Sequence, residues 1–135
     1  MTSTADERLY ETLPNGLHDA DLHSFVVDYT KRQLVLEVVA WVSVGEPTEL
    51  YRPARVTYRD LGFMCIEPPH DRAELNVAES VWIDAGIFDE KDERVAHFEV
   101  GGPVNWVFLR DFNSFIFFSA GDVAVEWTGP EEVRS

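Results

Sequence analysis

The residues best suited to chemistry stand close together near the start of the chain, in the stretch HDADLH at residues 18–23. Carboxylates and imidazoles are common ligands of divalent metals. In an extended strand, alternate side chains point to the same side, so Asp19, Asp21 and His23 would share one face. The stretch lacks the spacing and the second half of a known zinc or calcium motif, so we assign no metal ligand. His18, Asp19, Asp21 and His23 therefore form a candidate polar cluster.

This polar cluster allows two interpretations. In the first, it is part of a site for a small ligand or a divalent metal. In the second, it holds the entry of a strand, with Asp19 accepting hydrogen bonds from backbone donors and His18 bonding to a neighbouring loop.

No recognisable catalytic motif accompanies the cluster. The sequence contains no nucleophile elbow, phosphate-binding loop or dinucleotide fingerprint. The single cysteine, Cys65, stands in the apolar run FMCI, where desolvation raises the pKa of a thiol and no adjacent base is evident. We therefore interpret Cys65 as a buried structural residue and expect no catalytic residue and no cofactor.

Aromatic residues are dense between residues 106 and 118. Phe117 and Phe118 are consecutive, so in a strand they point to opposite faces. Either both faces are covered, or an aromatic patch is exposed for a partner or for a second copy of the chain. The candidate interaction surface consists of Trp106, Phe115, Phe117 and Phe118.

The sequence predicts that the segments positioning these groups are β-strands. Residues 23–29 and 33–44 are rich in β-branched side chains and flank a polar turn, which predicts a hairpin. Residues 33–44 are apolar on both faces, which favours a place at the centre of the fold. A short helical turn is predicted at 4–13. Further strands are predicted at 51–58, 63–66, 81–88, 95–100, 104–112, 114–120 and 123–128.

This pattern predicts an all-β fold. Eight or nine short strands with turn residues between them indicate an antiparallel β-sandwich or a partly open barrel, with at most short helical turns. A length of 135 residues corresponds to one domain, 1–135. We expect residues 1–13 and 130–135 to be peripheral to it.

The charge balance narrows the choice of partners. Twenty-five acidic residues against eleven basic ones give a formal net charge of −14. Nucleic-acid backbones and anionic membranes require a cationic surface, so neither is expected as a partner. The acidity is consistent with plain solubility, with attraction of a basic protein, or with mimicry of a polyanion. The lone cysteine and the absence of a leader sequence predict a cytoplasmic location.

The stretch NGLHDADL at residues 15–22, the hairpin after it, and the pair RVTY at 55–58 and LGF at 61–63 resemble a loose group of small bacterial β proteins. Their N-terminal pattern is a His-Asp-Ala or His-Asp-Ser step before a β-hairpin. Some members are proposed immunity proteins of polymorphic toxin systems. The resemblance covers about the first half of the chain and brings no catalytic residues.

The resemblance and the charge together predict a non-enzymatic intracellular interaction protein of the immunity type, with a basic protein partner. The alternative is a β domain that binds a small ligand or a divalent metal. A homo-oligomer built on the aromatic C-terminal strands is a third expectation.

Overall fold

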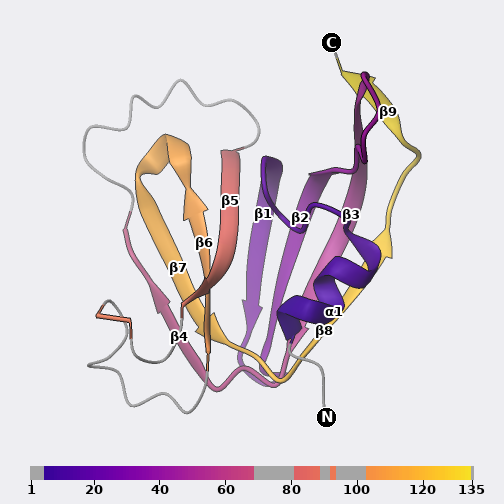
Figure 1. The fold of residues 1–135 in the computed structure, drawn as a ribbon. Coiled ribbons are helices and arrows are strands. Elements are labelled where there is room, and N and C mark those ends of the chain that lie inside the picture. The colour runs from indigo at the N-terminus through magenta and orange to yellow at the C-terminus, as the bar shows by residue number, and fades with distance from the viewer. Residues whose placement is uncertain (1–4, 69–80, 89–91, 94–102, 135) are drawn as a thin grey trace.

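The computed structural model describes residues 5–68, 81–88, 92–93 and 103–134. Within them the chain forms a nine-stranded antiparallel sheet with one α-helix, α1 (Ala5–Thr12), and one 3-10 helix, η1 (Arg110–Phe112) (Figure 1). The all-β prediction is thereby confirmed. The strands are β1 (Ala20–Asp28), β2 (Gln33–Trp41), β3 (Glu49–Arg59), β4 (Phe63–Ile66), β5 (Val81–Phe88), β6 (Val104–Leu109), β7 (Ser114–Ser119), β8 (Asp122–Trp127) and β9 (Glu132–Arg134).

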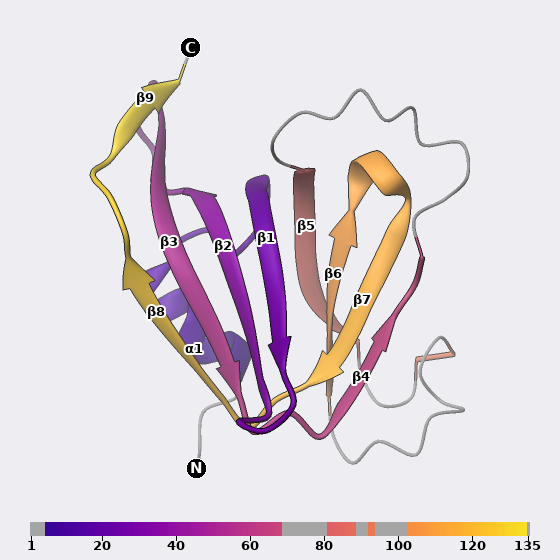
Figure 2. The ribbon, with the colours of Figure 1, turned by 180° about the vertical axis from the view of Figure 1, so that it is seen from behind.

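The strand order divides the sheet into two halves. The order is β4-β7-β6-β5-β1-β2-β3-β8, with β9 beside β3. Strands β1, β2, β3 and β8 form the first half, and β4, β7, β6 and β5 form the second half (Figure 2). Only the β1–β5 ladder joins the two halves along this order, and it contains three residue pairs, Ala20–Leu22 against Val81–Ile83.

The halves meet a second time where β3 turns into β4 and β7 turns into β8. We call residues 59–62 together with 119–122 the corner. The amide of Gly121 donates to the carbonyl of Arg59 at 3.0 Å, and the amide of Gly62 donates to the carbonyl of Ser119 at 3.1 Å. Backbone pairing therefore continues from the β3–β8 ladder into the β4–β7 ladder, near the bottom of Figures 1 and 2. The result is a strongly bent, partly open barrel.

The main core lies between the two halves. Tyr58 of β3 and Phe118 of β7 meet edge-on, with ring centroids 4.6 Å apart. They pack with buried side chains from most of the strands. The largest fully buried core side chains besides Phe118 include Leu34, Leu36, Val56, Ile83, Val107 and Ile116.

Helix α1 corrects the expectation of a peripheral segment at 1–13 for its described part, residues 5–13. The helix packs against β8, and Leu9 and Leu13 are buried in the main core together with Leu17 from the following turns (Figure 1). The leucines recur at a spacing of four residues, which places them on one side of the helix and the adjoining turn. Burial of this apolar side attaches the segment to the main core.

Several strand bounds match the sequence patterns and others do not. Strands β4 and β5 begin and end as predicted. The predicted strand 104–112 ends at Leu109 and continues as η1. The expected peripheral tail 130–135 contains β9, which pairs with the start of β3. The strand predicted at 95–100 lies outside the described residues.

Pro53 illustrates how β3 accommodates a missing backbone donor. The sequence suggests a proline at a strand start or edge. In the structure Pro53 lies inside β3, level with the interruption at residues 128–131 between β8 and β9. The amide of Thr128 donates to the carbonyl of Pro53 at 3.0 Å. Pro53 thus still bonds to the segment between β8 and β9 through its carbonyl, although it has no amide hydrogen to donate.

Candidate functional site

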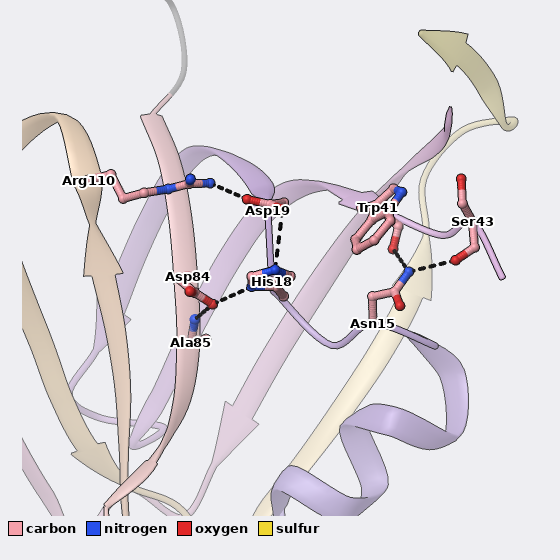
Figure 3. A network of polar contacts seen from close by, with 8 residues as sticks. All are labelled: Asn15, His18, Asp19, Trp41, Ser43, Asp84, Ala85 and Arg110. Carbon is pink, nitrogen blue, oxygen red and sulfur yellow. Dashed lines mark hydrogen bonds and ion pairs between the residues drawn. The ribbon is translucent and has the colours of Figure 1, made fainter. Parts of the chain in front are cut away.

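The segment that carries His18 is a succession of tight turns between α1 and β1. Gly16 and Asp19 both have a positive φ, of 56° and 54° respectively. Glycine adopts this conformation without cost, and aspartate is among the residues that tolerate it best. The side-chain amide of Asn15 donates to the carbonyls of Trp41 at 3.1 Å and Ser43 at 2.9 Å, which fastens the turns to the end of β2 (Figure 3).

The imidazole of His18 lies between two carboxylates. Its Nδ1 is 2.8 Å from Oδ1 of Asp84 on β5, and its Nε2 is 3.3 Å from Oδ2 of Asp19 (Figure 3). The other carboxylate oxygen of Asp19 accepts from the Arg110 guanidinium at 2.5 Å. The chain Asp84–His18–Asp19–Arg110 thus connects the turns before β1 with β5 and η1.

This arrangement raises the pKa of His18 above its usual 6.5. The largest cause is the hydrogen bond with Asp84. Partial burial opposes the shift, because it penalises the charged ring. The negative charges of Asp84 and Asp19 add to the increase in pKa, whereas the Arg110 guanidinium lowers it.

Asp21 belongs to a neighbouring set of contacts on β1. Its side chain is buried and accepts from Arg134 of β9 at 2.5 Å. The guanidinium of Arg134 also lies 4.3 Å from the ring centroid of Tyr51, and Tyr51 meets Trp82 edge-on at 6.4 Å. Trp82 is the cross-strand partner of Asp21. A buried carboxylate is costly unless it is paired, and Arg134 supplies that pairing.

We call the β1–β5 ladder, together with these two sets of polar contacts, the seam. Three of its contacts, His18–Asp84, Asp19–Arg110 and Asp21–Arg134, join segments far apart in the sequence. Arg110 additionally lies 5.7 Å from the Trp82 ring, and the backbone amide of Trp82 donates to Asp111 at 3.1 Å. The seam therefore supplements a short backbone ladder with charged side-chain bridges.

His23 does not belong to the seam. The β1–β2 register shifts between Leu22 and Ser24, so His23 occupies a bulge. Its exposed side chain lines a cavity that is separate from the contacts of His18. The prediction that Asp19, Asp21 and His23 share one face is therefore wrong, because a positive φ at Asp19 and the bulge at His23 both break the alternation.

The chemistry open to the seam is limited by its internal pairing. Both ring nitrogens of His18 face carboxylates, and the described contacts include no hydroxyl or thiol nucleophile on the imidazole. Among residues 5–68, 81–88, 92–93 and 103–134, no group of three His, Cys, Asp or Glu residues is arranged to hold a metal ion. In the same residues, no helix has the length and apolarity to cross a membrane.

The aromatic candidates divide between the two faces of the second half. Phe118 is fully buried in the main core, which corrects its assignment to an exposed surface. Phe117 is 7% exposed and packs in a second, smaller cluster with Phe88 and Val104. Trp106 and Phe115 are half-buried beside that cluster. Only these last two retain appreciable exposure.

The second cluster depends on a glycine opposite a tryptophan. Gly86 is the cross-strand partner of Trp106, and a Cβ added to Gly86 would lie 2.6 Å from the indole ring. Trp106 in turn stacks on Phe88 with ring centroids 5.9 Å apart. Cys65 was expected to be buried; it is half-buried and packs against this cluster.

Sequence reasoning missed the partners that complete the seam. Asp84 carried a detectable signal, because it is the lone charge in the apolar run VWIDAGIF. Arg110 and Arg134 carried no detectable signal, since each is separated from its partner by about ninety residues or more.

Comparison with known proteins adds no assignment: no protein-family model, curated protein or solved structure matches the chain.

Proposed function

We propose that this protein is a non-enzymatic interaction domain that binds a basic protein. The supporting observation is that the arginines in the described part of the chain are used internally, while the sequence as a whole has an excess of acidic residues. The seven described arginines each interact with a carboxylate or a backbone carbonyl of the same chain. They are Arg8, Arg32, Arg52, Arg55, Arg59, Arg110 and Arg134.

The carboxylate pairings show how the arginines are distributed. Arg55 bridges Glu37 and Glu126 across three strands, and Arg8 and Arg59 share Asp122 at the corner. Other carboxylates face solvent on the helix, in the loop after β2, at the start of β3 and just before β9. They include Glu11, Glu46, Glu49 and Glu131.

A surface with this charge distribution favours a cationic partner. With a net charge of −14, long-range attraction raises the encounter rate with a basic protein and disfavours acidic ones. The seam supports the non-enzymatic part of the proposal, because its histidine and carboxylates already have partners. The resemblance of residues 15–22 to proteins that include proposed immunity proteins supports a toxin domain as the partner.

The test begins with capture of the tagged full chain from its own cells at low salt, followed by identification and purification of the partner. Association is then measured by surface-based kinetics at about 50 and 300 mM salt. We expect the association rate to fall by at least about tenfold at the higher salt, since screening shortens the range of attraction. A partner whose association rate is insensitive to salt, or the recovery of no partner, would contradict the proposal.

A charge-reversal variant sharpens the measurement. Glu46→Lys combined with Glu131→Lys changes exposed positions, so the fold should be retained. We expect slower association than with the wild type and than with the neutral control Glu46→Gln with Glu131→Gln. For the immunity-type role, co-expression of the chain should suppress the toxicity of the partner in cells; a partner that is harmless when expressed alone would contradict that role.

A further inference from the structure

A cavity of about 370 Å³ lies between β1 and the second half of the sheet. Its origin is visible in the pairing of β1. Beyond Leu22, β1 stops pairing with β5 and continues from Ser24 beside β2 alone. The bulge at His23 marks the point where the two ladders separate. Strands β1 and β5 therefore separate there, and no strand of the described residues pairs with β1 on this side beyond Leu22.

The interior of the cavity is apolar and its rim is polar. His23, Ser24 and Glu67 line it from exposed positions, and Ser114 lines it from a buried position. The carboxylate of Glu67 is held in place by the backbone amide of Phe115, which donates to it at 2.8 Å. The apolar lining includes Leu22, Phe25, Val81, Leu109, Phe112 and Ile116.

We propose that this cavity binds a small neutral molecule with an apolar, ring-sized body and a hydroxyl head group. The volume falls at the lower end of the range of small-molecule pockets, and it exceeds the roughly 150 Å³ of a cavity that admits benzene. The apolar wall matches the body. The imidazole of His23 and the hydroxyls of Ser24 and Ser114 offer both donors and acceptors to a hydroxyl.

Charge selects against an anionic head group. Glu67 stands at the rim, and the whole chain carries a net charge of −14. A carboxylate ligand would lose its hydration while facing this negative potential. The proposal is independent of the basic protein partner, so either can fail while the other holds.

The first experiment compares two probes with the same body, 1-naphthol and 1-naphthoate, by calorimetric titration of the full chain. We expect 1-naphthol to bind with a negative heat-capacity change and to raise the melting temperature. We expect 1-naphthoate to bind at least tenfold more weakly at about 50 mM salt, with a smaller difference at 300 mM salt. No binding of 1-naphthol, or equal binding of the two probes, would overturn the proposal.

The second experiment places the site. Ser24→Phe and Ile66→Trp each add a large side chain to the lining from an exposed position, so folding is expected to survive in at least one of them. We expect each folded variant to lose at least tenfold in affinity for 1-naphthol. The matched control Val26→Phe adds a large side chain at an exposed position of β1 that does not line the cavity, and it should lose no more than about threefold, about 0.6 kcal/mol. Wild-type affinity in a folded Ser24→Phe or Ile66→Trp variant would overturn this location.

Discussion

The two halves of the sheet are joined at two places that differ in how they are held. At the corner, backbone hydrogen bonds run on from one half to the other, and Tyr58 and Phe118 pack behind them. At the seam, three residue pairs are supplemented by charged side chains, with His18 between Asp84 and Asp19. The corner is held mainly by backbone hydrogen bonds and apolar contacts, whereas the seam also depends on interactions between charged side chains.

This difference determines how each junction responds to its surroundings. Apolar burial depends weakly on pH, whereas a pairing that involves histidine changes with protonation near neutrality. The seam contacts of His18 are also half exposed, so salt weakens them. We therefore expect the corner to carry most of the stability and the seam to be the part that conditions can adjust.

The largest effect is expected from Phe118→Ala, directly beside the corner. Phe118 is fully buried and contacts Tyr58 of the other half, so truncation leaves a cavity between the halves. The free energy of unfolding should fall by about 3–5 kcal/mol, as measured by chemical denaturation. Phe118→Leu, which keeps much of the volume, should lose clearly less. A loss below about 1 kcal/mol for the alanine variant would show that the corner does not depend on this contact.

The sequence predicted the strands of both halves better than the two junctions. Strands β4 and β5 were located correctly because each is a short apolar run with turn residues on one side, before β4 and after β5. The core face of β2 also follows from its alternation, since Leu34, Leu36 and Val38 are all buried. These signals are local, and local signals are what a single sequence carries.

The junctions depend on contacts between distant residues. His18 and Asp84 are 66 residues apart, and Asp19 and Arg110 are 91 apart, so neither pairing leaves a spacing pattern. The bulge at His23 likewise arises from the register between two strands and not from its neighbours in the sequence. For this reason the sequence indicates the polar cluster at 18–23, but it does not indicate that one part of the cluster belongs to the seam and that His23 belongs to the cavity.

A smaller effect is expected when the seam is broken at Asp84. Its Oδ1 accepts from the backbone amide of Ala85 at 2.9 Å besides contacting His18, so Asp84→Ala removes two interactions. We expect a loss of about 1–2 kcal/mol in the free energy of unfolding at pH 6. Asp84→Asn keeps an acceptor oxygen without the charge and should lose less. Equal stability of the wild type and the alanine variant would contradict a supporting role for the seam.

The pH dependence of the seam should follow the protonation of His18. Because the folded pKa is raised above 6.5, the stabilisation is fully present below the unfolded pKa and is lost as the pH rises through the folded pKa. The difference in stability between the wild type and His18→Gln should therefore be largest below pH 6.5, at no more than about 1 kcal/mol, and should fade as the pH rises through the raised folded pKa. Denaturation curves across this range measure it. A difference that grows with pH would contradict the assignment.

The smallest effect on stability is expected from Arg110→Gln, which changes the electrostatics of His18 from a distance. The guanidinium of Arg110 lowers the pKa of His18, so its removal should raise that pKa further, although the exposed pair with Asp19 adds less than about 1 kcal/mol to stability. NMR titration of the His18 ring measures the shift, with His18→Gln to assign the resonance. Arg55→Gln is the matched control, because Arg55 pairs with Glu37 and Glu126 outside the seam and should leave His18 unchanged. If removing Arg110 left the pKa of His18 the same or lowered it, the connection of η1 to the seam through Asp19 would be wrong, and the corner would be the better-defined of the two junctions.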